Sequence, residues 1–291
     1  MNPVPNPDFR AGLAALIGRT NAGKSTLINA LVDAKVAIVS PKPQTTRHAV
    51  QGVVHRPEGQ IVFVDTPGFF KTTRSHLVDR LHGRARAALA GIDVVIHVAD
   101  PSRAMGEEDA MVLEVLAPIT IPKILCLTKL DIPDLKFREP WLELAADYHA
   151  TIELSALTGR NVDTLVDAVL PLMPPGPALY EAGDQTNAHR DFRVTEIIRE
   201  KIYLLTGDEV PYRTAVQLDH IRERNEKQAG DFLHVKAIVL VAEDRYKGML
   251  IGAGGRKIKE IGIAARPDVE TLLGQKIYLE LAVRVDARLP D

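Results

Sequence analysis

Cysteine and long apolar runs are both scarce in this chain. The single cysteine among 291 residues, Cys126, stands in the apolar run Ile124–Leu127. One thiol cannot form an internal disulfide, which excludes a disulfide scaffold and favours a reducing, cytoplasmic environment with Cys126 buried in a strand. No apolar run approaches the ~18 residues of a membrane span. The first residues also lack the basic and apolar regions of a signal peptide, so we expect a protein that stays in the cytoplasm.

An excess of charge of one sign is lacking as well. The chain has 36 Lys and Arg against 38 Asp and Glu, a net charge of -2, and residues 1–189 and 190–291 are each close to neutral. Any contact with nucleic acid must therefore come from a local patch. The 46% apolar and 25% charged residues are typical of globular proteins, and the length allows two ordinary domains.

Short apolar segments alternate with helical patterns through most of the first 175 residues or so. The spacing of Leu27, Ile28 and Leu31 predicts a helix over Lys24–Val32. The expected strands are Ala14–Ile17, His48–Val54, Gln60–Val64, Val94–Ala99, Lys123–Thr128 and Thr151–Leu154. This alternation predicts an α/β fold with a mixed, mostly parallel sheet and helices on both faces. Ligands of such sheets bind at the carboxyl ends of the strands.

A proline cluster marks a boundary between two domains. The segment Pro171–Pro177 cannot continue a helix, and the residues up to about Asn187 are polar. We expect a flexible tail at 1–10, a first domain at 11–173, a linker at 174–187 and a smaller α+β domain at 188–291. The elements expected in the second domain are a helix at Val194–Leu205, strands at Thr214–Ile221, Leu233–Val241 and Lys276–Val285, and a helix–loop–helix around residues 252–255.

A phosphate-binding loop is the first chemical motif. Gly18-Arg-Thr-Asn-Ala-Gly-Lys-Ser25 fits Gly-x4-Gly-Lys-Ser/Thr between a predicted strand and a predicted helix. Glycines let backbone N–H groups face the anion, and the helix N-terminus adds partial positive charge. We expect Lys24 to lie along the β- and γ-phosphates and the Ser25 hydroxyl to bind Mg²⁺. The alternative is a chance glycine-rich turn, which the strand and helix around it disfavour.

A second phosphate motif follows the apolar strand Ile61–Val64. Asp65-Thr-Pro-Gly68 places an acid where it can hold Mg²⁺ through water, and the Gly68 N–H where it can contact the γ-phosphate. Alone, this sequence is equally an ordinary turn; about forty residues after a phosphate loop, the functional interpretation is favoured. Phe69 stands where many signalling GTPases carry a water-orienting glutamine, so we expect slow unaided hydrolysis. Phe69 can also simply pack as an apolar residue.

The loop Thr45-Thr-Arg47 lies between these two motifs. We expect the hydroxyl of Thr46, chosen over Thr45, to complete the Mg²⁺ shell when a γ-phosphate is present. Loss of this contact on hydrolysis would release the loop, as in known switches. The alternative is that these residues are polar only because they lie in a loop. The predicted catalytic residues are thus Lys24, Thr46 and Gly68, and the predicted Mg²⁺ ligands are Ser25, Thr46 and Asp65.

A base site is predicted at the end of the strand Lys123–Leu127. Thr128-Lys-Leu-Asp131 resembles the Asn/Thr-Lys-x-Asp motif of GTP-binding proteins. The Asp131 carboxylate can accept hydrogen bonds from guanine N1–H and the 2-amino group, neither of which adenine offers, so an ATP-dependent enzyme is disfavoured. The stem of Lys129 can cover one face of the base. Thr128 replaces the commoner asparagine and can tie fewer loop groups, and Ser155-Ala-Leu157 matches a final guanine motif.

These motifs together predict a site for GTP or GDP. The residues expected to contact the nucleotide are Gly18, Arg19, Thr20, Asn21, Ala22, Gly23, Lys24, Ser25, Thr26, Asp65, Thr66, Pro67, Gly68, Phe69, Thr128, Lys129, Leu130, Asp131, Ser155, Ala156 and Leu157.

The second domain contains a glycine-rich loop before a basic helix. Ile251–Gly262 resembles the Gly-x-x-Gly loop and following helix of a KH domain, a loop that clamps about four single-stranded nucleotides. Five cations and no acid fall between Arg245 and Lys259. The alternative is a structural turn followed by a solvated helix. The residues expected to contact RNA are Ile251, Gly252, Ala253, Gly254, Gly255, Arg256, Lys257 and Lys259.

In combination, these motifs resemble the Era family of bacterial GTPases. The resemblance covers roughly residues 10–288 and rests on Gly18–Ser25, Gln44–His48, Asp65–Gly68, Thr128–Asp131, Ser155–Leu157 and Ile251–Gly262. It implies a P-loop GTPase domain followed by a smaller α+β KH domain of type II, with GTP, GDP and Mg²⁺ as ligands. The family pattern usually has Pro and Val where this chain has Thr20 and Ala22. Neither these departures nor Thr128 and Ala253-Gly254 remove a group that the basic chemistry requires.

The resemblance also implies partners and a cellular role. It implies binding to small-subunit ribosomal RNA near its 3′ end, assistance in assembly and maturation of the small ribosomal subunit, and peripheral association with the inner membrane. An apolar residue in place of the catalytic glutamine, here Phe69, belongs to the same pattern. The alternative function is a GTP-dependent switch that acts on a protein or membrane partner, with the second domain as a docking module.

Overall fold

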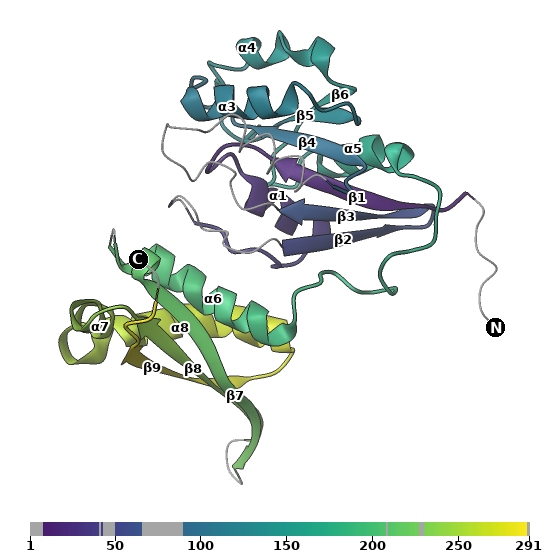
Figure 1. Ribbon diagram of the computed structural model, residues 1–291. Coiled ribbons are helices and arrows are strands. Elements are labelled where there is room, and N and C mark those ends of the chain that lie inside the picture. Colours follow the sequence, from purple (N-terminus) through teal and green to yellow (C-terminus); the bar gives the residue numbers. More distant parts are fainter. Residues whose placement is uncertain are drawn as a thin grey trace, which may run out of the picture. The chain divides into compact units, whose positions relative to one another are not determined.

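The computed structural model describes residues 8–40, 42, 50–65, 90–207, 209–226 and 230–289. Its contacts separate two compact units. One unit contains Met1–Ala37 and Thr46–Asn187, and the other contains Ile38–Thr45 and Ala188–Asp291. Figure 1 labels the helices and strands of both.

A six-stranded sheet forms the first unit, in the order β2-β3-β1-β4-β5-β6. The strands are β1 (Arg10–Ile17), β2 (Val50–Arg56), β3 (Gly59–Asp65), β4 (Val94–Ala99), β5 (Lys123–Leu127) and β6 (Ala150–Glu153). Neighbouring strands are parallel except in the antiparallel β2–β3 hairpin. The predicted mixed, mostly parallel sheet is therefore confirmed. Strands β1, β3, β4, β5 and β6 run in the same direction, so their carboxyl ends meet at one edge.

Helices cover both faces of this sheet (Figure 1). They are α1 (Lys24–Val32), α3 (Glu107–Leu116), α4 (Glu139–Leu142) and α5 (Val162–Val169), with 3-10 turns η1 (Ala145–Asp147) and η2 (Leu170–Leu172). Helix α3 buries Val112 and Leu116 against β1 and β4. On the α1 side, a Cβ on Gly52 would lie 2.6 Å from Val32, so the small residue lets α1 approach β2 closely.

The polar stretch after Pro177 is hydrogen-bonded along β2 and β3. The Val53 N–H donates to the Gln185 carbonyl at 2.9 Å. The Gln60 side-chain oxygen accepts from the N–H groups of Leu179 and Tyr180, at 2.7 and 2.9 Å. This segment covers the outer edge of the sheet, which would otherwise be open to pairing with another chain. Its largely polar composition carried no sign of this contact.

A three-stranded sheet, in the order β7-β8-β9, forms the second unit. Its elements are α6 (Arg190–Leu205), η3 (Val210–Arg213), β7 (Thr214–Glu226), β8 (Gly230–Val241), α7 (Asp244–Ile251), η4 (Ala253–Gly255), α8 (Arg256–Leu273) and β9 (Ile277–Val285). Strands β7 and β8 are antiparallel, and β8 and β9 are parallel. Ile198 of α6, Leu250 of α7 and Ile261 of α8 share one core with Val235 and Val239 of β8. The predicted small α+β arrangement is confirmed.

The β7–β8 hairpin is longer than predicted. The expected strands covered Thr214–Ile221 and Leu233–Val241, whereas pairing continues to Glu226 and resumes at Gly230. The added residues are mostly polar, so they show no apolar alternation, although their backbones still pair. Within the described parts of the chain, no helix has the length and apolar character needed to cross a bilayer.

Candidate functional site

Every strand that ends at the common edge of the large sheet leads into a polar segment. Strand β1 is followed by Gly18 and the phosphate loop, β3 ends at Asp65, β4 is followed by Asp100, β5 by Thr128, and β6 leads to Ser155. All except Asp100 belong to motifs expected to bind GTP. The parallel topology therefore brings together segments that are as far as 137 positions apart in the sequence, as the fold class requires.

The phosphate loop has the backbone that its glycines allow. A Cβ on Gly18 would lie 2.2 Å from the Val98 carbonyl oxygen, so only glycine fits beside β4. Asn21 and Gly23 have φ angles of 61° and 103°. These left-handed residues turn the chain sharply before α1 begins at Lys24. The Thr20 N–H donates to the Glu108 carboxylate at 3.2 Å, which shows that this amide can meet an anionic oxygen.

Lys24 spans the loop from the first turn of α1. Its Nζ donates to the carbonyl oxygens of Gly18 and Arg19 at 2.8 and 2.7 Å. Burial lowers the pKa of this ammonium group, while the charges of Asp65 and Glu108 oppose that shift. The ammonium is thus held within the phosphate loop by the protein itself, where it can meet the β- and γ-phosphates.

Ser25 and Asp65 meet across α1 and β3. The Ser25 hydroxyl donates to the Asp65 carboxylate at 2.9 Å, and Asp65 is fully buried. A hydroxyl and a carboxylate are the hard oxygen donors that Mg²⁺ prefers, so these two residues fit the ion. Thr26, also in the expected set, lies in the first turn of α1. Thr46, Thr66, Pro67, Gly68 and Phe69 lie outside the described residues.

The base-site segments after β5 and β6 are tied together. The Ser155 hydroxyl donates to the Asp131 carboxylate, and the Leu130 N–H donates to the Leu154 carbonyl at 3.1 Å. Asp131 remains exposed, whereas Ser155 is fully buried. The side chain of Leu157 is 77% exposed and so lies open to a ligand or to solvent. The Asp131 carboxylate is therefore fixed and accessible at once, as recognition of a guanine edge requires.

Thr128 connects the base site to the phosphate loop. Its Oγ1 lies 2.8 Å from the Ala22 carbonyl and 3.0 Å from the Ala99 carbonyl, and the residue is buried. One hydroxyl proton has to serve both acceptors. Thr128 therefore makes the contact with the phosphate loop that the commoner asparagine is expected to make, but with a single donor.

An ion cluster beneath the nucleotide motifs was not anticipated. Asp100, fully buried after β4, accepts a hydrogen bond from Lys129 Nζ at 2.6 Å. It lies 3.3 Å from Arg19 Nη2, and Asp109 lies 3.2 Å from Arg19 Nε. Burial lowers the pKa of Arg19, against the pull of Asp109 and Asp100. Arg19 therefore places its guanidinium among carboxylates, which leaves its backbone for any phosphate contact.

Asp100 could have been found by the reasoning that found Asp65. Asp65 is the last residue of β3 and Asp100 directly follows β4, and both apolar strands end at the ligand-binding edge. Only Asp65 stands in a known motif, and a lone acid after a strand carries little signal. Hydrogen bonds from Lys129 and Ser102 lower the pKa of Asp100 against the opposing effect of burial, so this carboxylate is charged at neutral pH.

The glycine-rich loop of the second unit is a sharp turn between α7 and α8. Gly252, Gly254 and Gly255 have φ angles of 67°, 60° and 79°. A Cβ on Gly252 would lie 2.9 Å from Cβ of Lys257, whereas none would meet an atom within 4 Å on Gly254 or Gly255. Ala253 and Gly254 are exposed. The loop therefore presents open backbone at the start of an eighteen-residue helix.

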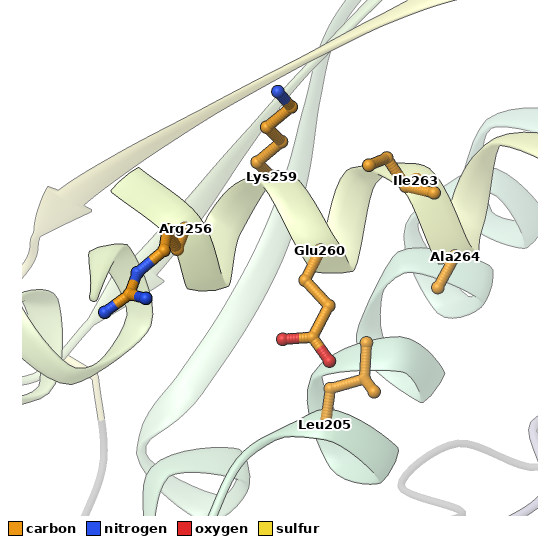
Figure 2. Close-up of a pocket in the computed structure, with 6 residues that line it drawn as sticks. All are labelled: Leu205, Arg256, Lys259, Glu260, Ile263 and Ala264. Carbon is orange, nitrogen blue, oxygen red and sulfur yellow. The ribbon is translucent and has the colours of Figure 1, made fainter. Parts of the chain in front are cut away.

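Four of the five cations near this loop fall into two groups. Arg245 pairs with Glu243 at 3.0 Å and Lys257 with Glu260 at 2.7 Å, acids just beyond the interval counted in the sequence. Within the described ranges, Arg256 and Lys259 make no ion pair. Both border a hollow of about 400 Å³ whose wall is otherwise largely apolar, and Figure 2 shows Lys259 and Glu260 on opposite sides of α8. The residues that line it are Leu205, Arg256, Lys259, Glu260, Ile263 and Ala264.

Comparisons with known proteins cover both units. A family model described as 50S ribosome-binding GTPase matches residues 13–129, and a KH-domain model matches residues 209–288. GTPase Era of Halothermothrix orenii is 38% identical over 283 residues, which cover 96% of this chain and 94% of that protein. GTPase Era of Geobacter metallireducens is 40% identical over 286 residues, with 96% and 93% covered.

Two solved structures share the whole architecture. A variant of Aquifex aeolicus Era bound to GDP and AlF4⁻ matches with a TM-score of 0.83 and 32% identity, over 96% of this chain and 95% of that one. Era in complex with MgGDPNP and nucleotides 1506–1542 of 16S ribosomal RNA matches with a TM-score of 0.84, the same identity and the same coverage. The chain therefore belongs to the Era family of GTPases, in which a GTP-hydrolysing domain is followed by a KH domain.

Proposed function

We propose that this GTPase is a GTP-controlled switch that binds small-subunit ribosomal RNA near its 3′ end and assists assembly and maturation of the small ribosomal subunit. It acts in the cytoplasm, where ribosomes assemble. We assign residues 11–173 to the GTPase domain, 174–187 to the linker and 188–291 to the KH domain. Peripheral membrane association stays a prediction from the family resemblance.

The nucleotide chemistry follows from the buried groups of the first unit. We assign Lys24 to the β- and γ-phosphates, because its ammonium already lies on carbonyls of the phosphate loop. Ser25 and Asp65 hold Mg²⁺, and Thr46 completes the ligand shell of the ion. When bound, the ion neutralises charge on the phosphates. In-line attack of water on the γ-phosphate is assisted by Lys24 and by backbone N–H groups, including that of Gly68.

Base selection and RNA binding involve different units. Asp131, fixed by Ser155, accepts from the guanine N1–H and 2-amino groups. In the second unit the open turn at Gly252–Gly255 receives the RNA backbone, with Arg256 and Lys259 beside it. The observation that carries the ribosomal role is the match over 96% of the chain to an Era structure that contains 16S ribosomal RNA.

Crosslinking in cell extract tests this role. The protein, loaded with a non-hydrolysable GTP analogue, is crosslinked to RNA, and the recovered RNA is sequenced. The test variant is Gly254→Asp with Gly255→Asp, because a Cβ at either position meets no atom within 4 Å and Asp tolerates positive φ better than most residues. The matched control is Gly254→Asn with Gly255→Asn, which has the same shape without the negative charge.

The three proteins separate the possible outcomes. We expect one small-subunit ribosomal RNA segment with the unmodified protein and with the Asn pair, and its loss with the Asp pair, because carboxylates repel phosphates. Equal recovery with both pairs would overturn the backbone clamp. No enrichment of ribosomal RNA with the unmodified protein would overturn the assembly role and favour a switch that acts on a protein partner.

A further inference from the structure

Asp100 is a fully buried carboxylate at the end of β4, outside every nucleotide motif. Its Oδ1 accepts hydrogen bonds from the Ser102 N–H at 3.0 Å and the Ser102 hydroxyl at 2.5 Å. Its Oδ2 accepts from Lys129 Nζ at 2.6 Å and lies 3.3 Å from Arg19 Nη2. Arg103 Nε pairs with the same oxygen at 3.7 Å. Three hydrogen bonds and two ion pairs thus converge on one carboxylate, which fixes its position and its charge.

Two of the residues that contact Asp100, Lys129 and Arg19, come from different halves of the nucleotide site. Lys129 belongs to the base motif, and Arg19 belongs to the phosphate loop. The guanidinium of Arg19 also donates to the Asp100 main-chain carbonyl at 3.2 Å and pairs with Asp109. Asp100 therefore connects a residue beside the base to a residue beside the phosphates.

Lys129 is held at both its backbone and its side chain. Its φ angle of 63° is in the left-handed region, which non-glycine residues adopt at a cost. The Ile132 N–H donates to its carbonyl at 2.9 Å, and the neighbouring Leu130 N–H is also bonded. The turn is thus held at the backbone, and Asp100 holds the far end of the side chain. About a third of that side chain stays exposed, which leaves part of the stem accessible to a ligand.

We propose that Asp100 is a positioning residue for guanine nucleotides: it holds the Lys129 ammonium so that the aliphatic stem lies ready against the base, and its contact with Arg19 fixes this arrangement relative to the phosphate loop. The proposal rests on the assignment of the base site made above. A free lysine side chain has many rotamers and loses them on binding. A lysine already held by a buried carboxylate loses fewer.

Asp109 provides a matched control. Both carboxylates are buried and both pair with Arg19, but only Asp100 contacts Lys129. Asp100→Asn and Asp109→Asn therefore disturb the same cluster, and only the first weakens the hold on the base side. A change that acts through general stability or through the phosphate loop alone would affect both variants alike.

The measurement is the preference for GDP over inorganic pyrophosphate. Displacement of a fluorescent GDP analogue gives both dissociation constants in the presence of Mg²⁺, and their ratio cancels losses in the phosphate site. Because the bond to Asp100 is a charged one, we expect Asp100→Asn to reduce this ratio roughly tenfold, and Asp109→Asn to change it by less than about twofold. An unchanged ratio in Asp100→Asn, or equal losses in the two variants, would overturn the proposal.

A second set of variants keeps the test decisive if Asp100→Asn folds poorly. Ser102→Ala removes one hydroxyl donor from Asp100, and we expect a smaller reduction of the same ratio. Lys129→Met keeps an apolar stem without the ammonium, and in that background Ser102→Ala should have no further effect on the ratio. A further loss that multiplies with that of Lys129→Met would show that Ser102 and Asp100 act by another route.

Failure of the base site itself has a different signature. If the unmodified protein does not prefer GDP to ADP, or if Asp131→Ala leaves that preference intact, the assignment of the base site is wrong and the role of Asp100 is overturned with it. If the preference exists and Asp131→Ala abolishes it, while Asp100→Asn and Ser102→Ala bind GDP and pyrophosphate in the original ratio, only the role of Asp100 is overturned.

Discussion

The two units use charged side chains in opposite ways. In the first, Lys24, Asp65 and Asp100 are buried and hydrogen-bonded to other parts of the protein. In the second, Arg256 and Lys259 are exposed beside the glycine-rich loop and, in the described part of the chain, belong to no ion pair. One site is fixed before any ligand arrives, and the other presents its cations to solvent, with Arg256 donating to the Ala253 carbonyl at 3.3 Å.

This difference suits the two kinds of ligand. A nucleotide is small, so its affinity depends on protein groups that are already in position and therefore lose little conformational entropy on binding. An RNA strand brings many phosphates, and its affinity comes largely from released counterions, which does not require fixed side chains. Changes to the buried groups should therefore have large, local effects, and changes to the exposed cations should each have a small effect.

The largest effect is expected from Lys24→Ala. The variant removes a buried ammonium that lies on two carbonyls of the phosphate loop. Because the proposed role of this group is to stabilise charge on the transferring phosphate, hydrolysis should fall about 10²–10³-fold. Phosphate release in single-turnover conditions, with protein in excess over GTP, measures the chemical step.

Lys136→Ala is the control for this change, because that side chain is 72% exposed and pairs with the similarly exposed Asp134 at 4.0 Å. We expect its rate to match that of the unmodified protein. A loss of less than about tenfold in Lys24→Ala would contradict the assignment of Lys24, because one lost charge-stabilising donor usually costs more.

The next largest effect is expected from salt, which should weaken RNA binding far more than GDP binding. If the loop holds about four phosphates of a single strand, log K should fall with log salt at a slope near -3, so affinity for RNA drops roughly 50-fold between 50 and 200 mM salt. GDP binding, which depends on buried groups, should change only a few fold over the same range. Titrations of both ligands at four salt concentrations measure the slopes. Equal slopes would contradict the proposed difference between the two sites.

Lowering the pH should reduce the stability of the first unit more than that of the second. His97 of β4 is buried against Trp141 and Tyr148, and burial lowers its pKa from 6.5 to about 3. Because the unfolded chain takes up the proton below pH 6.5 and the folded chain does not, this stability is present above pH 6.5 and is lost as the pH falls toward 3. At pH 5 the free energy of unfolding is lower by about 2 kcal/mol than at neutral pH because of this one group.

Urea unfolding at pH 7 and pH 5 measures this loss. Trp141 is the only tryptophan in the chain and lies 5.5 Å from the His97 ring, so its fluorescence reports on this region. His97→Phe keeps a ring there but cannot take up a proton. We expect the stability difference between the two pH values to shrink in the variant, whereas an unchanged difference would show that other groups cause it.

Much of the fold could be predicted from the sequence because apolar periodicity is strong in both units. Helix α1 and strand β4 have the predicted limits, and Cys126 is buried in β5, as its apolar neighbours indicated. The extended end of the β7–β8 hairpin and the contact between residue 185 and β2 were missed. Both depend on backbone pairing, which polar side chains do not reveal.

The site was predictable only where a motif names the residues. Ser25 and Asp65, forty positions apart, are brought within hydrogen-bonding distance. Asp100 and Asp109 carry no motif, and their place around Arg19 emerges only when β4 and α3 are folded beside the phosphate loop. Sequence reasoning assigned Arg19 to the nucleotide, and it could not foresee where its side chain would point.

The smallest effect is expected from Lys259→Gln. Lys259 is exposed on α8 and points away from Glu260 (Figure 2). Among the residues that the structure describes it forms no ion pair that would have to break before it contacts a phosphate. Loss of one such contact should weaken RNA binding a few fold and make the salt slope shallower by about 0.7. The control is Lys276→Gln, because that side chain is 84% exposed but pairs with Glu270 at 3.0 Å. If the two variants have the same slope while the Asp pair at Gly254 and Gly255 still abolishes binding, the strand leaves the loop on the side of α8 away from Lys259, and the exposed cations then contribute less to the second site than the backbone does.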